Sequence, residues 1–287
     1  MIKKAFSFTL YLLFFGISLL PFWALYLISD GLSFILQKLV KYRKRVIEHN
    51  LKTCFPEKSK SELEQIRNQV YRNLADLIVE SIKMITLSRK TLQSRYKLIN
   101  PEIFNDSKYQ KGSLACWAHF NNWEWGALAL ATLSNTTVIG LYKPINNISV
   151  EKMIFKIRSR FGSILTPKKK WLRTVVAHKA EKTLSLFIGD QKPAAGEKGN
   201  SLIFLGRETP VIIGFEKAAK ITEFEVIYIQ CKKVKRGFYE INFIPMNDKP
   251  DLENLTLTKK YFSLLEADII NNPSGWLWSH NRWNIKK

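Results

Sequence analysis

Apolar residues are concentrated in one long run near the N-terminus. About 25 residues, from Ala5 to Ser29, pass without a charged side chain, and most of them are Leu, Phe, Ile, Tyr or Trp. A helix of this length would cross a hydrocarbon core roughly 30 Å thick. The run is longer than the apolar region of a secretory signal, and no small-residue cleavage site of the A-x-A kind is visible. We therefore predict one N-terminal transmembrane helix, with residues 1–30 as a membrane anchor.

Pro21 lies inside this run and leaves a second arrangement open. A proline within a helix removes a backbone hydrogen bond and kinks or ends the helix. The segment could therefore dip into one leaflet instead of spanning the bilayer. A helix buried in a protein core is a third arrangement, which the length of the run disfavours.

Basic residues flank the run on both sides. Lys3 and Lys4 precede it, and a larger group follows, made of Lys38, Lys41, Arg43, Lys44 and Arg45. By the positive-inside rule, this excess predicts that the rest of the chain lies in the cytoplasm. These side chains would lie among anionic lipid headgroups, where each contributes on the order of 1 kcal/mol.

A helical pattern follows the basic stretch. Ser61, with Glu64 three residues later, predicts a capping box at the start of a helix that ends near Thr86. The apolar positions at helical spacing are Ile66, Val70, Leu74, Leu77, Ile78 and Ile82. We predict one long amphipathic helix whose apolar stripe packs on the rest of the protein, within a basic juxtamembrane and helical segment at residues 31–95.

From Gly112 onward, short apolar runs alternate with helical patterns. The apolar runs predict strands at residues 113–118, 136–142, 183–188, 224–230 and 238–244. Helical patterns lie near residues 122–133, 148–160, 171–181 and 211–221. Strands this apolar, interleaved with helices, are typical of a largely parallel sheet covered on both faces. The predicted fold class is therefore α/β, with an open, mostly parallel sheet flanked by helices.

The charge balance narrows the choice of partners. The 287 residues are 46% hydrophobic and 24% charged, which excludes an intrinsically disordered chain. They contain 45 Lys and Arg against 24 Asp and Glu, a net charge of +21, so an anionic partner is expected: nucleic acid, anionic lipid or an acidic carrier protein. No nucleic-acid-binding motif is present, and the aromatic residues lie in apolar runs, so we predict no nucleic-acid partner. A non-catalytic, basic, membrane-tethered binding protein stays open as the alternative.

Cysteine and histidine spacing argues against disulfides and metals. Cys54, Cys116 and Cys231 are few, odd in number and far apart, which favours a reducing compartment. The four histidines show no two-ligand spacing such as H-E-x-x-H. We predict no metal site and no cofactor.

His119 and Glu124 are the candidate catalytic pair. They form an H-x4-E pattern just past the first predicted strand, and ligands of open α/β sheets bind beyond the carboxyl ends of strands. The two side chains can meet only if the chain turns between them, which the strand-to-helix junction allows. The imidazole could then take a proton from a hydroxyl while the carboxylate fixes its tautomer. The alternative is a chance pattern in which His119 merely caps a helix.

The H-x4-E segment and several others resemble the lauroyl/myristoyl lipid A acyltransferases, a family that shares H-x4-D/E with the wider glycerolipid acyltransferases. The resemblance covers most of the chain, from the N-terminal anchor to Trp283. It includes Tyr142-Lys143-Pro144, where the family usually has Tyr-Arg-Pro, then Arg158-Ser159-Arg160, Gly189-Asp190-Gln191 and a closing segment from Pro273 to Trp283 rich in Trp.

The resemblance implies an O-acyltransferase with a glycerolipid acyltransferase-like fold, whose catalytic domain is residues 96–287. It implies an acyl carrier protein thioester as donor, a hydroxyl of a lipid A precursor as acceptor, and contact with membrane lipids. The implied location is the bacterial inner membrane, with the catalytic domain on the cytoplasmic face. A lysophospholipid, an aminolipid or a glycolipid stays open as another acceptor.

The resemblance also implies roles for single residues. Arg158 matches the arginine near the scissile carbonyl, where a cation would stabilise the oxyanion, and Arg160 is its rival. Lys143 replaces a planar arginine fork with a point charge. The residues placed at the substrate are Asn122, Lys143, Arg160, Asp190 and Gly206, although Asp190 could be a structural loop residue and Gly206 is first interpreted as turn chemistry.

Two further features concern surfaces. The basic segment, residues 143–173, holds nine Lys or Arg against the single Glu151. An acidic carrier protein and a phosphorylated acceptor would both be attracted to it, while a solvated basic face is the simpler interpretation. Trp276, Trp278 and Trp283 either fill the core, which we favour, or lie at the level of lipid headgroups.

Overall fold

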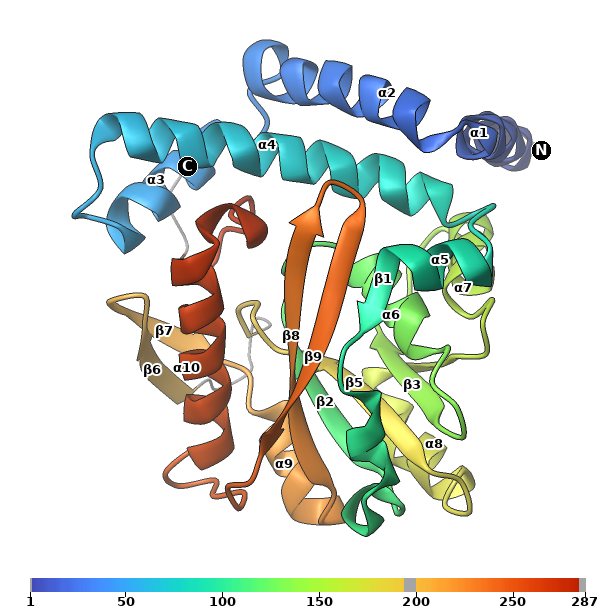
Figure 1. Ribbon diagram of the computed structural model, residues 1–287, viewed down its shortest axis with the longest axis vertical. Coiled ribbons are helices and arrows are strands. Elements are labelled where there is room, and N and C mark those ends of the chain that lie inside the picture. The colour runs from blue at the N-terminus through green and yellow to red at the C-terminus, as the bar shows by residue number, and fades with distance from the viewer. Residues whose placement is uncertain (1, 194–199, 284–287) are drawn as a thin grey trace.

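The computed structural model describes residues 2–193 and 200–283 (Figure 1). Its centre is a seven-stranded sheet with the order β1-β9-β8-β2-β5-β3-β4. The strands are β1 Tyr96–Leu98, β2 Ser113–Trp117, β3 Thr137–Tyr142, β4 Ile164–Pro167, β5 Thr183–Ile188, β8 Glu225–Lys235 and β9 Phe238–Met246. A separate antiparallel hairpin is formed by β6 Asn200–Phe204 and β7 Arg207–Val211.

The prediction of a mostly parallel sheet is confirmed, with one exception. Neighbouring strands are parallel except β8 and β9, which form a long antiparallel hairpin. All five predicted strands are present. The short edge strands β1 and β4 and the hairpin β6–β7 were not predicted, because runs of three to five residues carry little periodicity.

Helices cover both faces of the sheet (Figure 1). The elements are α1 Ile2–Leu19, α2 Phe22–Phe34, the π-helix η1 Ile35–Leu39, α3 Lys44–Cys54, α4 Lys60–Lys83, α5 Arg89–Arg95, α6 Trp123–Leu130, α7 Ile148–Arg158, α8 Trp171–Ala177, α9 Gly214–Thr222 and α10 Thr256–Asn271. Short 3-10 helices lie at η2 Pro101–Asn105, η3 Ser107–Tyr109, η4 Lys168–Lys170 and η5 Pro273–Gly275.

The central strand β2 shows why such strands are apolar throughout. All five of its residues are buried. Leu114 and Cys116 pack into the core under α9 and α10, while Ala115 and Trp117 pack into the core under α5 and α6. Alternating side chains of one strand thus serve two cores, which confirms that the sheet is covered on both sides.

The prediction of a single helix from Ala5 to Ser29 is wrong, because the chain breaks at Pro21. Pro21 has an extended backbone (φ −64°, ψ 156°) between α1 and α2, and it cannot donate a helical hydrogen bond. The carbonyl oxygens left at the end of α1 are capped from α4 and the residues after it: Lys83 donates to Ser18 and Leu20, and Thr86 donates to Ser18. Hydrogen bonds from α4 and the residues after it therefore stabilise the break between α1 and α2.

The two N-terminal helices form a layer along one side of the molecule, with α2 lying lengthwise on α4 (Figure 1). Hydrogen bonds hold α2 there, because Tyr26 donates to Glu80 and Ser29 donates to Asp76, both at 2.8 Å. Among the described residues, no single helix has the length and apolarity that a membrane span requires. Only the bent pair Phe22–Leu39 and Lys44–Cys54, which meet at 88°, has them in combination.

The long helix α4 is present, but its boundaries differ from the prediction. Its capping box is formed by Ser59 and Glu62, not by Ser61 and Glu64, and the helix ends at Lys83. Its buried face holds Val70, Tyr71, Ala75, Asp76, Val79 and Glu80. The predicted stripe is only partly buried, and Ile78 is exposed, because the carboxylates of Asp76 and Glu80 take interior positions through the hydrogen bonds from α2.

Candidate functional site

His119 stands at the carboxyl end of the central strand β2, in a loop held by the C-terminal segment. The backbone N–H of Asn121 donates to Gly275 at 2.7 Å, and that of Leu277 donates to His119 at 3.1 Å. Asn121 has φ +52°, the left-handed conformation that turns the chain from strand to helix. The predicted turn between His119 and Glu124 is therefore present.

The carboxylate that contacts His119 is Asp190, not Glu124. Nδ1 of His119 lies 2.8 Å from Oδ1 of Asp190, just past the end of β5. The other oxygen of Asp190 accepts a hydrogen bond of 2.9 Å from the indole Nε1 of Trp276. An ionised carboxylate only accepts, so Nδ1 of His119 carries the proton and Nε2 is left as the acceptor. Asp190 thus takes the tautomer-fixing position that we predicted for Glu124.

The electrostatics of this pair favour a basic imidazole. Burial lowers the pKa of His119, but the charge of Asp190 and the hydrogen bond to it outweigh burial, so the pKa lies above its ordinary 6.5. Burial raises the pKa of Asp190, but the attraction of His119 and the hydrogen bonds from His119 and Trp276 outweigh it, so that pKa is lowered. Both shifts stabilise an imidazolium beside a carboxylate.

Glu124 binds Arg158 instead. The guanidinium donates from Nε at 2.9 Å and from Nη2 at 2.5 Å to the two carboxylate oxygens, a bidentate pair. Glu124 is in the first turn of α6 and Arg158 is the last residue of α7, so each charge also matches the dipole of its own helix. The three predicted catalytic residues therefore fall into two interactions, His119 with Asp190 and Glu124 with Arg158.

A cavity of about 410 Å³ joins the two pairs. His119, Glu124 and Arg158 line it together with Lys143, Lys168 and Gln191. Apolar side chains also line it, among them Leu128, Leu141, Leu165, Leu186, Phe187 and Ile212. A lining that combines a basic imidazole and other charged groups with apolar side chains suits a substrate that has a reactive head and a hydrocarbon chain.

Of the five predicted substrate contacts, Lys143 lines the cavity and Asp190 binds His119 behind it, while the other three lie elsewhere. Asn122 is buried, where its side chain caps α6 through the N–H of Trp125 and donates to Glu80. Arg160 donates to the backbone carbonyls of Met84 and Ile85, beyond the end of α4. These two side chains make structural hydrogen bonds and are not among the residues that line the cavity beside His119.

Gly206 is the third. Leu205 and Gly206 both have positive φ and form the two-residue turn of the β6–β7 hairpin, as expected of a type I′ turn. The interpretation of Gly206 as turn chemistry is confirmed, and this glycine is not among the residues that line the cavity.

The structure also shows contributions that sequence reasoning missed. Trp276 was expected to fill the core or to lie at the level of lipid headgroups; it is buried, and its indole also donates a hydrogen bond to Asp190. Gln191 places its amide 3.5 Å from Nε2 of His119. The ring of Trp123 packs edge-on against His119 with 5.0 Å between ring centroids. The signal for the first two lay in the motifs Gly189-Asp190-Gln191 and Pro273 to Trp283.

The remaining predictions about charge and metals can be placed on the structure. Lys143 and Lys168 from the basic segment line the cavity, so part of this positive charge lies at the site. The three cysteines are free and buried. Within residues 2–193 and 200–283, no group of three or more His, Cys, Asp or Glu side chains is arranged to hold a metal ion.

We compared the chain with protein families and with known proteins. The family model of bacterial lipid A biosynthesis acyltransferases matches residues 1–285. A lipid A biosynthesis acyltransferase of Haemophilus influenzae is 21% identical over 248 residues, 84% of this chain and 75% of that protein. The lipid A biosynthesis lauroyltransferase and palmitoleoyltransferase of Escherichia coli are 20% and 22% identical, and each alignment covers 93% of this chain and 87% of the relative. The chain therefore belongs to the bacterial lipid A biosynthesis acyltransferases, enzymes that transfer acyl groups in lipid A synthesis.

Proposed function

We propose that this enzyme transfers a fatty acyl group from an acyl carrier protein thioester to a hydroxyl of a lipid A precursor. The observation that carries the proposal is the imidazole of His119, which is held by Asp190 through Nδ1 and lines a cavity that also has Arg158 and several apolar side chains in its lining. That arrangement suits general-base catalysis on a hydroxyl.

The proposed reaction is a direct transfer. Nε2 of His119 takes the proton of the acceptor hydroxyl as the hydroxyl oxygen attacks the thioester carbonyl carbon. The tetrahedral intermediate collapses by breaking the carbon–sulfur bond, and the thiolate takes the proton from the imidazolium. The products are an ester and the free carrier thiol, and Asp190 stabilises the imidazolium between the two steps.

Arg158 is the proposed oxyanion partner. Glu124 occupies Nε and Nη2 of its guanidinium, which leaves Nη1 for the developing negative charge on the carbonyl oxygen. Glu124 then acts by fixing this cation, a role different from the one predicted by H-x4-E. A donor fixed before the reaction needs no reorganisation in the transition state.

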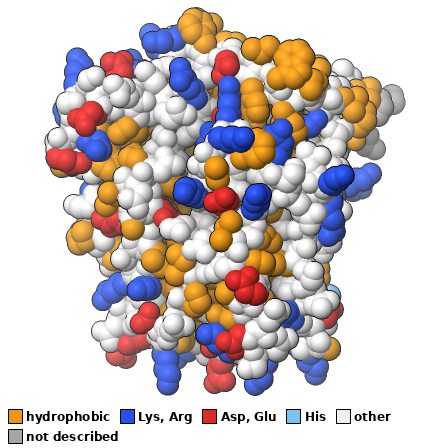
Figure 2. All heavy atoms as spheres, viewed as in Figure 1, with side chains coloured by type: hydrophobic (Ala, Val, Ile, Leu, Met, Phe, Trp, Pro, Cys, Tyr) orange, Lys and Arg blue, Asp and Glu red, His pale blue; other side chains and the backbone are white. Residues whose placement is uncertain are grey.

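The donor and the membrane are proposed to meet the enzyme on different surfaces. The basic segment, with Lys143 and Lys168 at the cavity, suits an acidic carrier protein. The layer of α1 and α2 faces outward with apolar side chains such as Leu19, Trp23 and Leu27 (Figure 2). We propose that this layer binds the cytoplasmic face of the bacterial inner membrane.

The test is an acylation assay in membranes. Membranes that contain the protein are incubated with acyl carrier protein thioesters and an underacylated lipid A precursor, and the lipids are analysed by mass spectrometry. Wild type should add one acyl group, and His119→Ala, Glu124→Ala and Asp190→Asn should add little or none. Asp248→Asn, an exposed aspartate, is the matched control and should keep full activity.

The outcomes separate the competing functions. If the wild-type enzyme acylates another lipid of the same extract but not the precursor, the acceptor is a lysophospholipid, an aminolipid or a glycolipid. If no lipid gains mass, or if His119→Ala stays fully active, the catalytic proposal fails and a binding protein is the better description.

A further inference from the structure

A buried carboxyl group lies behind the turn that joins His119 to Glu124. It belongs to Glu80 of α4, which is 1% exposed and is not among the residues that line the cavity at His119. The reaction proposed above makes no use of it. Burying a carboxyl group is costly unless its oxygens are hydrogen-bonded, so the partners of Glu80 indicate what it holds in place.

Three donors from separate parts of the chain converge on this carboxyl group. The hydroxyl groups of Tyr26 in α2 and Tyr239 in β9 each donate at 2.8 Å, and the side-chain amide of Asn122 donates at 2.6 Å. Burial, together with the charge of Asp76, raises the pKa of Glu80, although these hydrogen bonds oppose the shift. Both oxygens are therefore hydrogen-bonded, Oε1 by Tyr26 and Oε2 by the other two donors.

Asn122 is the point at which these hydrogen bonds reach the catalytic turn. It directly precedes α6, and its side-chain oxygen accepts the backbone N–H of Trp125 at 2.9 Å. A residue that caps the start of a helix must present an acceptor to the helix, so the amide nitrogen is left to face Glu80. One amide thus joins the first turn of α6 to the carboxyl group behind it.

A second hydrogen bond ties the same helix to Glu80. The indole Nε1 of Trp125 donates to the backbone carbonyl of Glu80 at 2.7 Å. Glu80 therefore binds the start of α6 through its backbone as well as its side chain. Glu124, which pairs with Arg158, lies between Asn122 and Trp125 in this first turn. The orientation of the Glu124 carboxylate thus depends on how the start of α6 is held.

The neighbouring residue of the turn is held by a different element. The side-chain amide of Asn121 donates to the backbone carbonyl of Cys231 in β8 at 2.8 Å. His119 and Glu124 therefore lie at opposite ends of a turn whose two asparagines are each tied to the structure behind it. A misplacement of about 1 Å in a reacting group can cost about 10²-fold in rate, so these ties matter for catalysis although they touch no substrate.

We infer that Glu80 is a positioning residue that holds the catalytic turn through Asn122. The inference rests on the proposed function, because it concerns the turn that carries the proposed base. Glu80 lies outside the lining of the cavity, so it acts through Asn122 and not on the substrate. Through Tyr26 the same carboxyl group also binds the N-terminal layer, which places the turn two hydrogen bonds away from α2.

The test combines acylation kinetics with hydrogen–deuterium exchange, both on the full-length protein in detergent. Glu80→Met keeps the length of the side chain but removes both oxygens, whereas Glu80→Gln keeps an acceptor for Asn122 and is the conservative variant. Asn122→Ser keeps a good helix cap but is too short to reach Glu80. It therefore breaks the same link even if Glu80→Met does not fold.

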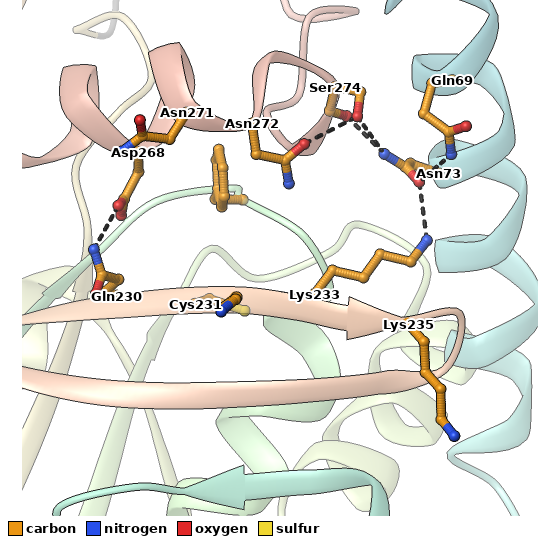
Figure 3. Close-up of a pocket in the computed structure, with 12 residues that line it drawn as sticks. Gln69, Asn73, Gln230, Cys231, Lys233, Lys235, Asp268, Asn271, Asn272 and Ser274 are labelled. Carbon is orange, nitrogen blue, oxygen red and sulfur yellow. Dashed lines mark hydrogen bonds between the residues drawn. The ribbon is translucent and has the colours of Figure 1, made fainter.

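Asp268→Leu is the matched control. Asp268 of α10 is a second buried carboxylate that accepts from a tyrosine hydroxyl and from a side-chain amide, Tyr228 at 2.7 Å and Gln230 at 2.6 Å. Figure 3 shows the hydrogen bond to Gln230. Its removal therefore costs similar hydrogen bonds, but no printed partner of Asp268 belongs to the catalytic turn.

The inference expects the turn and the rate to change together. Glu80→Met and Asn122→Ser should each lower kcat about tenfold or more, with less than about a threefold change in KM. Both should speed amide exchange in a peptide that covers residues 119–126. The double variant should be no slower than the worse single variant, since both changes break one link. Glu80→Gln should stay within about threefold of wild type, and Asp268→Leu should leave kcat and the exchange of this peptide unchanged.

Two results would overturn the inference. One is exchange of the 119–126 peptide that is the same in Glu80→Met, Asn122→Ser and Asp268→Leu. The other is a double variant whose loss in kcat is the product of the two single losses, because Glu80 would then not act through Asn122. The exchange measurement needs no turnover. If wild type transfers no acyl group, the proposed function fails, and the exchange of the turn alone decides whether Glu80 holds it.

Discussion

The imidazole of His119 is oriented by a carboxylate 71 positions further along the chain. Asp190 in turn accepts a hydrogen bond from Trp276, so hydrogen bonds to this one carboxylate join three segments that are far apart in the sequence. The H-x4-E pattern identified His119 and Glu124 as site residues but paired them wrongly. Glu124 instead pairs with Arg158, and this choice depends on where α7 ends relative to α6.

Replacing Asp190 should change both the rate and the pH profile. In Asp190→Asn the amide does not impose the tautomer and removes the charge that raises the pKa of His119, whereas burial, which lowers it, remains. The neutral imidazole is the form that acts as the proposed base, so the acid limb of kcat/KM should lie at lower pH in this variant than in wild type. The rate should fall by about 10²–10⁴-fold. An acid limb that stays in place would contradict the role of Asp190.

Trp276 should act on the rate through Asp190. Trp276→Phe keeps most of the ring but removes a hydrogen bond to a charged group, a loss of about 1.5 kcal/mol or roughly tenfold in kcat/KM. The matched control is Trp278→Phe, because the indole of Trp278 is equally buried but donates to the carbonyl of Pro273. The control should lower stability and leave the pH profile of kcat/KM unchanged. If both variants lose activity alike, Trp276 has only a packing role.

At the scale of helices and strands, the sequence pattern predicted the long elements but not the residues at which the helix α4 begins and ends. The strands at 113–118, 136–142 and 183–188 were predicted within one residue of β2, β3 and β5. The predicted start of α4 was two residues too late, because the sequence offers two possible capping boxes. Ser59 stands three residues before Glu62, and Ser61 stands three residues before Glu64. The backbone conformation at Ser59 selects the first.

The free energy of unfolding of two serine variants shows which serine caps α4. Ser59→Ala should lower the free energy of unfolding by about 1 kcal/mol, since it removes the acceptor for the N–H of Glu62. Ser61→Ala lies within the first turns of the helix and should change it by less than about 0.5 kcal/mol. Thermal unfolding of both variants in the same detergent is the measurement. A larger effect at Ser61 would show that the helix starts where the sequence pattern had placed it.

At the scale of the whole molecule, the outer side of the N-terminal layer is apolar. Its inner side carries the buried Leu25 together with Ser29 and Tyr26, which bind carboxylates of α4, while Trp23 and Leu27 are 69% and 63% exposed. An exposed apolar side of this kind suits the proposed binding to a bilayer. The basic residues that follow α2 would then contact anionic headgroups.

Membrane binding should therefore depend on the outer side of α2. Leu27→Glu should weaken partition of the full chain onto vesicles of phosphatidylglycerol and phosphatidylcholine by tenfold or more, because burial of such a side chain contributes about 1.5–3 kcal/mol. Ile221→Glu, at a position on α9 that is 65% exposed, is the matched control and should leave partition unchanged. Vesicle flotation provides the measurement, and equal partition of Leu27→Glu and wild type would exclude this surface.

The chain's own pattern was sufficient for the open α/β sheet, the approximate place of its central strands, the position of His119 at a strand end and the resemblance to lipid A acyltransferases. These follow from local periodicity and from short motifs, which need no knowledge of distant contacts. The partner of His119, the burial of Asn122, the engagement of Arg160 at the end of α4 and the break at Pro21 followed only from the folded chain. Each depends on which segments far apart in sequence come to lie side by side, and a hydrogen bond between such segments leaves no periodic trace in either one.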